Sequence, residues 1–366
     1  MKVRPHQEGQ MEFSIHSEVV NLYSKLLDSQ TLFRQMGQVE FVTQPKEIIY
    51  RENKLILYHY QSKLKKAAQT PLLIVFALIN RPDILDFSPD HSLIRNLLEA
   101  GRDVYLIDWG YPSAEDKDIS WSVYIKRYLK NCIKKIKQKS AQSSMDLLGI
   151  CQGGVMSLCY ASLFPQDIKR LILISTSVNF QTEKDILSLW AQKIPIASLR
   201  ERPGNVPGSW LAQAFSSIRP FQVRGKKYLA LLDHLSAEKP DQAWLKDFFL
   251  LEKWQLDTPD QTSLAFTQFI QWFYQQNSLI QGKLFLEKDH IDLKKLNMPI
   301  LNLAARDDHI VPPSASRALK RYVQSKDYSF KTLPSGHVGI YISRKTREQL
   351  PKLILSWLKD RDGKVW

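Results

Sequence analysis

The sequence has 366 residues, of which 44% are hydrophobic and 24% charged, a composition typical of a globular protein with a sizeable core. Its longest uninterrupted apolar run is the eight residues from Leu72 to Ile79, whereas a membrane-spanning helix needs roughly 20, and residues 1–15 contain no apolar signal-peptide core. We therefore expect neither a transmembrane segment nor secretion. The three cysteines lack metal-ligand spacing, which argues against a disulfide framework and a cysteine zinc site and favours a reducing compartment.

The formal net charge of +14 favours anionic partners such as nucleic acid, acidic lipid or a phosphate-bearing small molecule, but it does not choose among them. The densest basic stretch is 126–139, where lysine and arginine alternate with apolar residues at helical spacing. We interpret this stretch as an amphipathic helix with a solvated basic face.

In chain order, the first predicted element is a helix over Ser17–Met36, in an N-terminal extension of residues 1–44. Strands over Glu47–Tyr50 and Leu55–Tyr60 then flank a short turn, which predicts a hairpin. From there on, short apolar runs alternate with segments long enough for crossover helices, the pattern of buried parallel strands. These runs are Leu72–Leu78, Val104–Ile107, Met145–Leu148 and Leu171–Ile174.

The same alternation returns near the end of the chain, with strands over Ile300–Ala304 and Tyr328–Leu333, a helix over Ser314–Val323 and a last helix near Thr346–Leu358. Between residues 179 and 296 it lapses into a helical, aromatic-rich segment. We therefore predict an α/β core formed by 45–178 and 297–366, interrupted by a helical cap over 179–296.

The most informative stretch is Leu147–Gly154, which reads Leu-Leu-Gly-Ile-Cys-Gln-Gly-Gly and leads into a helix predicted over Val155–Phe164. A strand that runs into G-x-C-x-G and then a helix is a nucleophile elbow, here with Cys151 where serine usually stands. The glycines let the strand and helix backbones approach closely around a strained turn. The helix dipole would also favour the thiolate of Cys151.

An elbow of this kind predicts an acid after a later strand and a histidine after the last one. The strand Ile300–Ala304 leads into Arg-Asp-Asp-His at 306–309, and the last strand leads into Gly-His-Val-Gly at 336–339. The candidate triad is therefore Cys151, His337 and an aspartate. Spacing alone leaves Asp307 and Asp308 open, since either could simply cap the helix that follows.

Other residues receive lesser predictions. We expect His309 to be structural or supporting, and Cys132 and Cys159 to be buried packing residues. An oxyanion hole needs two backbone N–H groups, which we assign to Gln152 after the nucleophile and to Ile79 or a neighbour in the loop after Leu72–Leu78.

Phosphate-loop, dinucleotide and H-E-x-x-H motifs are absent, so nucleotide hydrolysis, a dinucleotide fingerprint and a zincin site lack support. We expect no metal and no permanently bound cofactor. A thiol nucleophile instead suits exchange between thioesters, because a serine ester would lose the activated acyl group. A large aromatic cap would help to exclude water from such a site.

At this point the sequence resembles the catalytic subunit of polyhydroxyalkanoate synthases, in particular the two-subunit class III enzymes, over about residues 45–360. The likeness rests on Phe76–Pro82, Leu106–Gly110, Gly149–Gly154, Asp308–Pro313 and Gly336–Tyr341, with Glu252–Trp254 and Phe273–Asn277 in the cap. It implies an α/β-hydrolase fold that converts 3-hydroxyacyl-CoA, usually 3-hydroxybutyryl-CoA, into polyester and releases CoA.

The resemblance also implies roles for individual residues. Cys151 would hold the growing chain, His337 would activate it, and Asp308 would assist the hydroxyl of the acyl unit, which decides between the two aspartates. CoA enters as the thioester substrate rather than as a bound cofactor. The resemblance further implies a second, non-catalytic subunit, a homo-oligomer, and a cytoplasmic location at the surface of polyester granules. The basic composition and the segment Leu199–Phe215 depart from the family pattern.

Two other classes of function stay open. A cysteine-dependent hydrolase of the same fold, such as a thioesterase, lactone hydrolase or depolymerase, would pass the acyl group to water. A non-catalytic granule-surface protein or a nucleic-acid binder would need the triad to be accidental, and we expect no nucleic-acid partner. The products of the reaction distinguish the hydrolase from the synthase, because a hydrolase forms free acid and a synthase forms polymer. Binding to nucleic acid would weaken steeply with salt.

Overall fold

The computed structural model describes residues 39–41, 44–60, 62, 64, 70–182, 186–201, 203–218, 226–235 and 241–363. The predicted helix Ser17–Met36 lies outside this part of the chain. The chain forms two compact units, one made of Met1–Phe41 with Arg219–Gln255 and the other of Val42–Ile218 with Leu256–Trp366. The larger unit contains all the candidate site residues.

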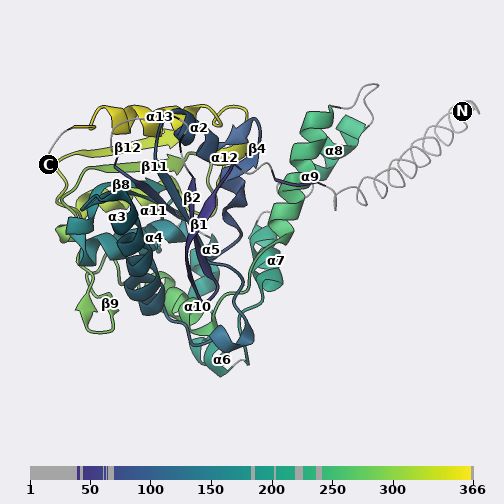
Figure 1. Ribbon diagram of the computed structural model, residues 1–366. Helices are drawn as coiled ribbons and strands as arrows, with labels where there is room; N and C mark the ends of the chain where they lie inside the picture. Colours follow the sequence, from purple (N-terminus) through teal and green to yellow (C-terminus); the bar gives the residue numbers. More distant parts are fainter. Residues whose placement is uncertain are drawn as a thin grey trace, which may run out of the picture. The chain divides into compact units, whose positions relative to one another are not determined.

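An eight-stranded sheet runs through the larger unit in the order β1-β2-β6-β3-β7-β8-β11-β12 (Figure 1). The pairs β1–β2 and β2–β6 are antiparallel, and all later neighbours are parallel, as the apolar runs predict. The strands are β1 (Glu47–Glu52), β2 (Leu55–Tyr60), β3 (Leu72–Val75), β6 (Val104–Asp108), β7 (Met145–Ile150), β8 (Ile168–Ile174), β11 (Ile300–Ala305) and β12 (Tyr328–Leu333).

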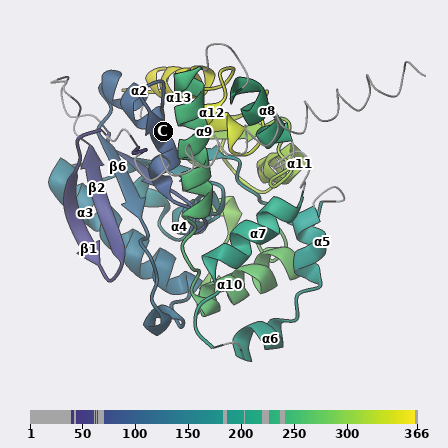
Figure 2. The same ribbon diagram turned by 90° about the vertical axis from the view of Figure 1, so that its right-hand side faces the viewer.

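The predicted hairpin is confirmed, and its turn has a simple cause. Asn53 adopts a φ of 52°, in the left-handed region that asparagine tolerates better than most residues. Its side-chain amide donates to Asp116 at 2.7 Å, which fixes the turn to the body of the unit. The hairpin forms the edge of the sheet beside α3, as Figure 2 shows.

Helices cover both faces of the sheet. The helices α2 (Leu93–Glu99) and α13 (Gln349–Lys359) lie on one face, and α3 (Lys130–Ser140) and α4 (Gln152–Leu163) on the other (Figure 1). The shorter elements of the core are η2 (Pro82–Leu85), β4 (Asp86–Ser88), β5 (His91–Ser92), η3 (Ala114–Asp116), η5 (Pro165–Asp167), η8 (Leu293–Lys295), α11 (Pro313–Arg317), η9 (Ala318–Arg321) and α12 (Gly339–Ile342).

Several predicted boundaries are wrong by a few residues. The strand predicted to reach Leu78 ends at Val75, because the chain turns away from the ladder there. The helix after the nucleophile begins at Gln152 rather than Val155, directly behind Cys151. The single helix predicted over Ser314–Val323 is instead an α-helix followed by a 3₁₀ turn.

The amphipathic character of the basic stretch is confirmed. It forms a π-helix η4 (Val123–Leu129) that continues into α3, with Ile125, Ile133 and Ile136 fully or almost fully buried. Its cations lie outward, and Arg127 pairs with Glu52 at 2.6 Å. Ion pairs within the chain thus engage part of the basic face.

The segment predicted as a cap is helical, and part of it shares the core of the larger unit. Within this unit it forms α5 (Ile186–Gln192), α6 (Ile196–Glu201), α7 (Gly208–Ile218), α10 (Ser263–Phe269), the π-helix η7 (Ile270–Gln275) and the small hairpin β9 (Phe285–Leu286) and β10 (Asp289–His290). Phe269 stacks on Trp121 with ring centroids 5.2 Å apart, and Phe273 lies 4.9 Å from the same indole. These aromatic contacts stabilise the packing of the predicted cap segment against the core by more than the burial of apolar area alone provides.

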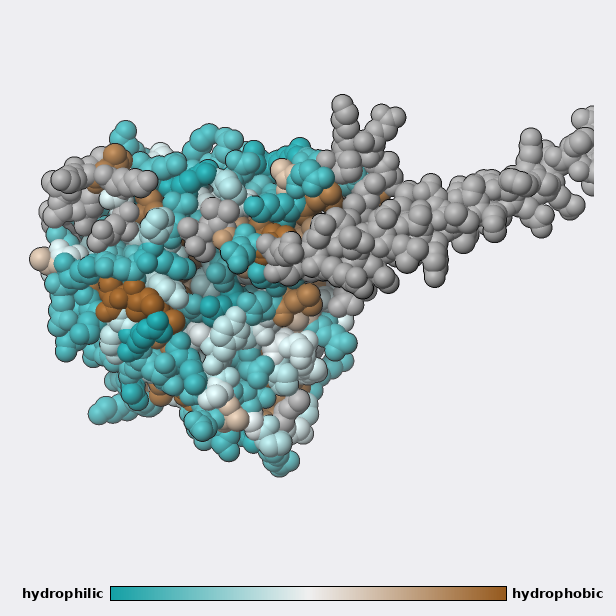
Figure 3. Space-filling model, turned by 45° about the vertical axis from the view of Figure 1, so that its right-hand side comes forward, coloured by the Kyte–Doolittle hydropathy of each residue, from teal (hydrophilic) through white to brown (hydrophobic). Residues whose placement is uncertain are grey.

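The smaller unit contains α8 (Lys226–Leu235) and α9 (Gln242–Leu256). Leu231, Leu245, Phe248 and Phe249 form its buried cluster, which gives the two helices a core of their own. Within the described part of the chain, no helix combines the length and hydropathy needed to cross a bilayer. On the face drawn in Figure 3, hydrophilic side chains cover most of the coloured surface and hydrophobic ones form separate small patches.

Candidate active site

Cys151 sits at the turn between β7 and α4, as the sequence predicts for a nucleophile. Its φ is 51° and its ψ −119°, a backbone conformation that non-glycine residues rarely adopt and that costs about 1–3 kcal/mol. The turn is held by the N–H of Cys151, which donates to the carbonyl of Ile174 at 2.9 Å. The side chain is half-buried at the carboxyl end of the sheet.

The neighbouring glycines explain why the elbow tolerates no side chains there. A Cβ on Gly153 would lie 2.2 Å from the carbonyl oxygen of Val75, and one on Gly154 would lie 1.9 Å from Oγ1 of Thr176. A Cβ on Gly149 would lie 2.5 Å from the Cα of Gly154. These distances are far below van der Waals contact, so α4 can start this close to the sheet only with glycine at all three positions.

The acid and the histidine meet at the same edge of the sheet. Nδ1 of His337, after β12, lies 2.7 Å from Oδ2 of Asp308, after β11. The other carboxylate oxygen accepts the N–H groups of Ile310 and Val311 at 2.9 and 2.8 Å. The Asp308 side chain is fully buried, whereas 16% of His337 is exposed. Asp308 is therefore rigidly held and His337 remains accessible on one side.

These contacts shift both pKa values toward the charged forms. Burial alone would raise the pKa of Asp308, but the charge of His337, its hydrogen bond and the two backbone donors lower it. Burial alone would lower the pKa of His337, but the charges of Asp308 and Cys151 and hydrogen bonds to both side chains raise it well above 6.5. The structure thus brings Cys151, His337 and Asp308 together.

The neighbours of Asp308 are placed differently. Asp307 is exposed and bonds to the guanidinium of Arg306 at 3.0 Å, which lowers the pKa of its carboxyl group. Because Asp307 is paired with Arg306 whereas Asp308 contacts His337, the geometry favours Asp308 as the partner of the histidine. His309 is half-buried beside Asp308. The predicted burial of Cys132 and Cys159 is confirmed, and burial raises the pKa of both thiols.

The loop after β3 is placed beside the elbow, as an oxyanion hole requires. The N–H of Leu78 already donates to the side-chain oxygen of Gln152 at 3.0 Å, so it is engaged elsewhere. Ile79 and Asn80 follow in the same turn, both half-buried, with Asn80 at a φ of 61°. The assignment of Ile79 and of the main-chain N–H of Gln152 as oxyanion donors stays a prediction.

Two anchors of this loop escaped the sequence-based prediction. The indole N–H of Trp109 donates to the carbonyl of Phe76 at 2.9 Å. Arg81 forms a two-point ion pair with Asp108, at 2.6 and 2.5 Å, and stacks on the Tyr111 ring. The motifs that contain these residues are visible in the sequence, but nothing in one sequence pairs positions 27 or more residues apart.

Tyr341 is a further neighbour that the sequence did not single out. Burial and the charges of Cys151 and Asp308 raise the pKa of its phenol well above 10. Its hydroxyl therefore stays protonated near the candidate nucleophile at neutral pH. No group of three or more histidine, cysteine, aspartate or glutamate side chains in the described residues is arranged to hold a metal ion.

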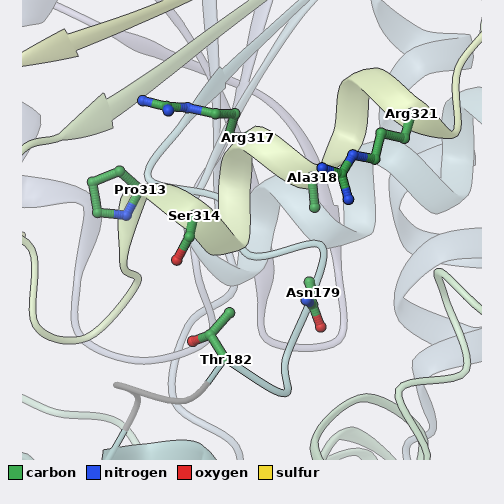
Figure 4. A pocket seen from close by; sticks show the side chains of 7 residues that line it. All are labelled: Asn179, Thr182, Pro313, Ser314, Arg317, Ala318 and Arg321. Carbon is green, nitrogen blue, oxygen red and sulfur yellow. The ribbon is translucent and has the colours of Figure 1, made fainter.

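A surface pocket of about 460 Å³ lies between the loop after β8 and the helical turn after Pro312 (Figure 4). Asn179, Thr182, Pro313, Ser314, Arg317, Ala318 and Arg321 line it. None of the three residues of the candidate triad is among them. Arg317 lies over the Phe330 ring, and Figure 4 shows its guanidinium turned away from Asn179 and Thr182. The pocket is thus separate from the site around Cys151.

Comparisons with known proteins identify the fold that carries these residues. The family model of the α/β-hydrolase fold matches residues 71–342, and the solved carboxyl esterase of Bacillus coagulans superimposes with a TM-score of 0.58 at 12% identity, over 87% of this chain and 99% of the esterase. A monoacylglycerol lipase of Paleococcus ferrophilus gives 0.51 at 17% identity, over 85% of this chain and all of the lipase. The chain is an α/β-hydrolase fold protein, as predicted.

Closer relatives narrow the class. The model described as the N-terminus of poly-beta-hydroxybutyrate polymerase matches residues 15–97. The poly(3-hydroxyalkanoate) polymerase subunit of Allochromatium vinosum is 42% identical, over 87% of this chain and 89% of its own length, and that of Thiocystis violacea is 40% identical, over 94% and 96%. The chain belongs to the poly(3-hydroxyalkanoate) polymerase family.

Proposed function

We propose that this protein is the catalytic subunit of a polyhydroxyalkanoate synthase that polymerises (R)-3-hydroxyacyl-CoA, with 3-hydroxybutyryl-CoA as its substrate, and releases CoA. The observation that carries the proposal is the hydrogen bond of 2.7 Å between His337 and Asp308, which lie beside a nucleophile elbow with cysteine at its turn. The chain is also 42% identical to a named polymerase subunit. The Cys151, His337 and Asp308 triad and the CoA substrate are parts of this proposal.

In the first step His337 takes the proton of Cys151, and the thiolate attacks the carbonyl carbon of the acyl-CoA. The negative charge that develops on the carbonyl oxygen is met by the N–H groups of Gln152 and Ile79. The bond between the carbonyl carbon and the CoA sulfur then breaks, while the new bond to the Cys151 sulfur remains. CoA takes the proton from His337 as it leaves. The raised pKa of His337 suits this role, because it favours proton uptake from the thiol.

In the second step the 3-hydroxyl of an acyl unit attacks the Cys151 thioester. His337 removes the hydroxyl proton, and Asp308 stabilises the resulting imidazolium. The new ester bond lengthens the chain by one unit, while the proton returns to the sulfur that leaves. Water would compete for the same thioester, so the site must exclude it.

The proposal extends to the surroundings of the enzyme. We place it in the cytoplasm at the surface of polyester granules, as a homo-oligomer that works with a second, non-catalytic subunit. The net charge of +14 supports attraction of the anionic CoA phosphates, which raises the encounter rate.

The test measures CoA release from 3-hydroxybutyryl-CoA and analyses the acyl product in the same tube, with and without a co-expressed partner subunit. Wild-type protein should give insoluble polyester in step with CoA, and Cys151→Ala should give neither while remaining folded. Cys132→Ala is the matched control, because it removes a fully buried thiol and should keep activity. Normal CoA release by folded Cys151→Ala would contradict the covalent step.

A cysteine-dependent hydrolase is the second candidate, supported by the esterase and lipase among the similar folds. It would release free 3-hydroxybutyrate in step with CoA and leave no polymer. The same assay therefore separates the two functions.

A further inference from the structure

The side chain of Gln152 has a buried position next to the nucleophile. Only 3% of the residue is exposed. Its Oε1 accepts the N–H of Leu78 at 3.0 Å, and its Nε2 has no hydrogen-bond partner among the described residues. A buried amide nitrogen without a partner costs free energy, so this side chain is not placed there for its own stability.

The bond to Leu78 fixes a turn that has left the sheet. The β3 ladder ends at Val75, and the turn that follows leads to Ile79 and Asn80. Leu78 is buried, so its N–H needs a protein partner. Gln152 supplies that partner from a position 74 residues away in the sequence. The turn's orientation therefore depends on the Gln152 side chain.

The backbone of Gln152 is fixed to the same place by a different contact. Gly153 packs so tightly that a Cβ there would lie 2.2 Å from the Val75 oxygen and 2.5 Å from the Phe76 oxygen. The first turn of α4 thus rests on the end of β3, while the Gln152 side chain reaches one step further to Leu78. The Gly153 backbone and the Gln152 side chain together hold the elbow and the loop in register.

We propose that Gln152 is a positioning residue that sets the distance between the two oxyanion donors. Its main-chain N–H is one donor, and its side chain, through Leu78, orients the following N–H groups as the other. This inference rests on the oxyanion hole of the proposed function. It predicts an effect on the transition state rather than on substrate binding, because the oxyanion charge develops only there.

The experiment compares three variants in the steady-state rate of CoA release. Gln152→Met keeps the shape and the main-chain N–H but removes the acceptor for Leu78. We expect kcat to fall about 10- to 100-fold with KM changed less than about twofold, somewhat less than the loss of a whole donor. Gln138→Met, an exposed position on α3, is the matched control and should behave as wild type.

Gln152→Glu provides a readout that a packing role would not give. Its carboxyl group can still accept from Leu78, but its ionised form places a negative charge beside the developing oxyanion. The ratio of its rate to the wild-type rate should therefore rise as the pH falls and the carboxyl becomes neutral. This ratio also decides the case if Gln152→Met does not fold.

Wild-type kcat in folded Gln152→Met, or a ratio for Gln152→Glu that is flat with pH, would overturn the inference. A rise in KM as large as the fall in kcat would also overturn the inference, because it would indicate a general distortion of the site. Free 3-hydroxybutyrate in place of polymer would contradict the proposed synthase but leave this test intact, since it follows CoA release alone. A wild-type protein that releases no CoA even with the co-expressed partner subunit would overturn both.

Discussion

The two ends of strands β7 and β8 differ in how their polar side chains are buried and paired. At the amino ends, Asp146 and Arg170 pair across the strands at 2.7 and 2.6 Å, with both side chains fully buried. Arg170 also donates to the carbonyl of Leu358 and to Asp362, each at 2.9 Å. At the carboxyl ends lies Cys151, half-buried in a strained turn.

The comparison indicates that one end of the sheet holds contacts that stabilise the fold, whereas the other end holds the candidate active site. At the amino end every charged group has its partners within the fold, and the network ties α13 to the strands. At the carboxyl end Asp308 is as well satisfied as Asp146, but the group it supports, His337, keeps an open side. Breaking the first network should therefore destabilise the fold, and breaking the second should lower the activity of a protein that stays folded.

The largest expected effect is on stability. Arg170→Met leaves Asp146 charged, buried and without its partner, so the free energy of unfolding should fall by about 3–5 kcal/mol. Denaturant unfolding monitored by tryptophan fluorescence measures it. CoA release per folded molecule should stay near the wild-type value.

The control for this variant replaces both charges. Asp146→Leu combined with Arg170→Met removes the uncompensated carboxylate and should recover most of the lost stability. A single variant that unfolds like wild type would show that the buried network does not support the fold.

A smaller effect in free energy is expected at the carboxyl end. Asp308→Asn should lower kcat/KM for CoA release by about 10²-fold, equivalent to about 2.7 kcal/mol, while the protein stays folded. Because the charge of Asp308 raises the pKa of His337, its removal lowers that pKa. The limb of the pH–rate profile that reports His337 should therefore move to lower pH.

Asp307→Asn is the matched control, since Asp307 is exposed and pairs with Arg306. It should leave both the rate and the pH profile unchanged. If the two variants exchanged phenotypes, Asp307 rather than Asp308 would be the acid.

The smallest effect is expected for a charge outside both networks. Lys126 bonds to Glu287 and, at 2.8 Å, to Asp289, but Glu287 is exposed and Asp289 only half-buried. Lys126→Met should change the free energy of unfolding by less than about 1 kcal/mol, and high salt should reduce the difference further. A loss as large as that of Arg170→Met would mean that burial does not distinguish the two kinds of pair.

The sequence predicted the parallel core and the residues that meet at its carboxyl edge. The strands are short apolar runs, and the candidate site residues follow strand ends in a fixed order, so both are local signals. The resemblance to polyhydroxyalkanoate synthases selected Asp308, and the hydrogen bond to His337 supports that choice.

The sequence could not show where a strand ends within a longer run of apolar residues. Phe76, Ala77 and Leu78 continue the apolar run of β3 because they are buried, yet they form no ladder. Apolar residues report burial rather than pairing. The strand predicted to begin at Leu171 in fact begins at Ile168, because Arg170 looks like a surface residue until its partners are known.

The positive φ of Cys151 is a demand on the backbone of this turn rather than on the atom that reacts. The turn constrains the backbone and the glycines around it, and neither constraint depends on whether the side chain ends in sulfur or oxygen. Serine differs from cysteine in that one atom, and the two residues are one nucleotide apart in the genetic code. The elbow backbone would therefore accept either nucleophile without rebuilding, so a single point mutation at Cys151 exchanges a thiol for a hydroxyl in an otherwise unchanged turn.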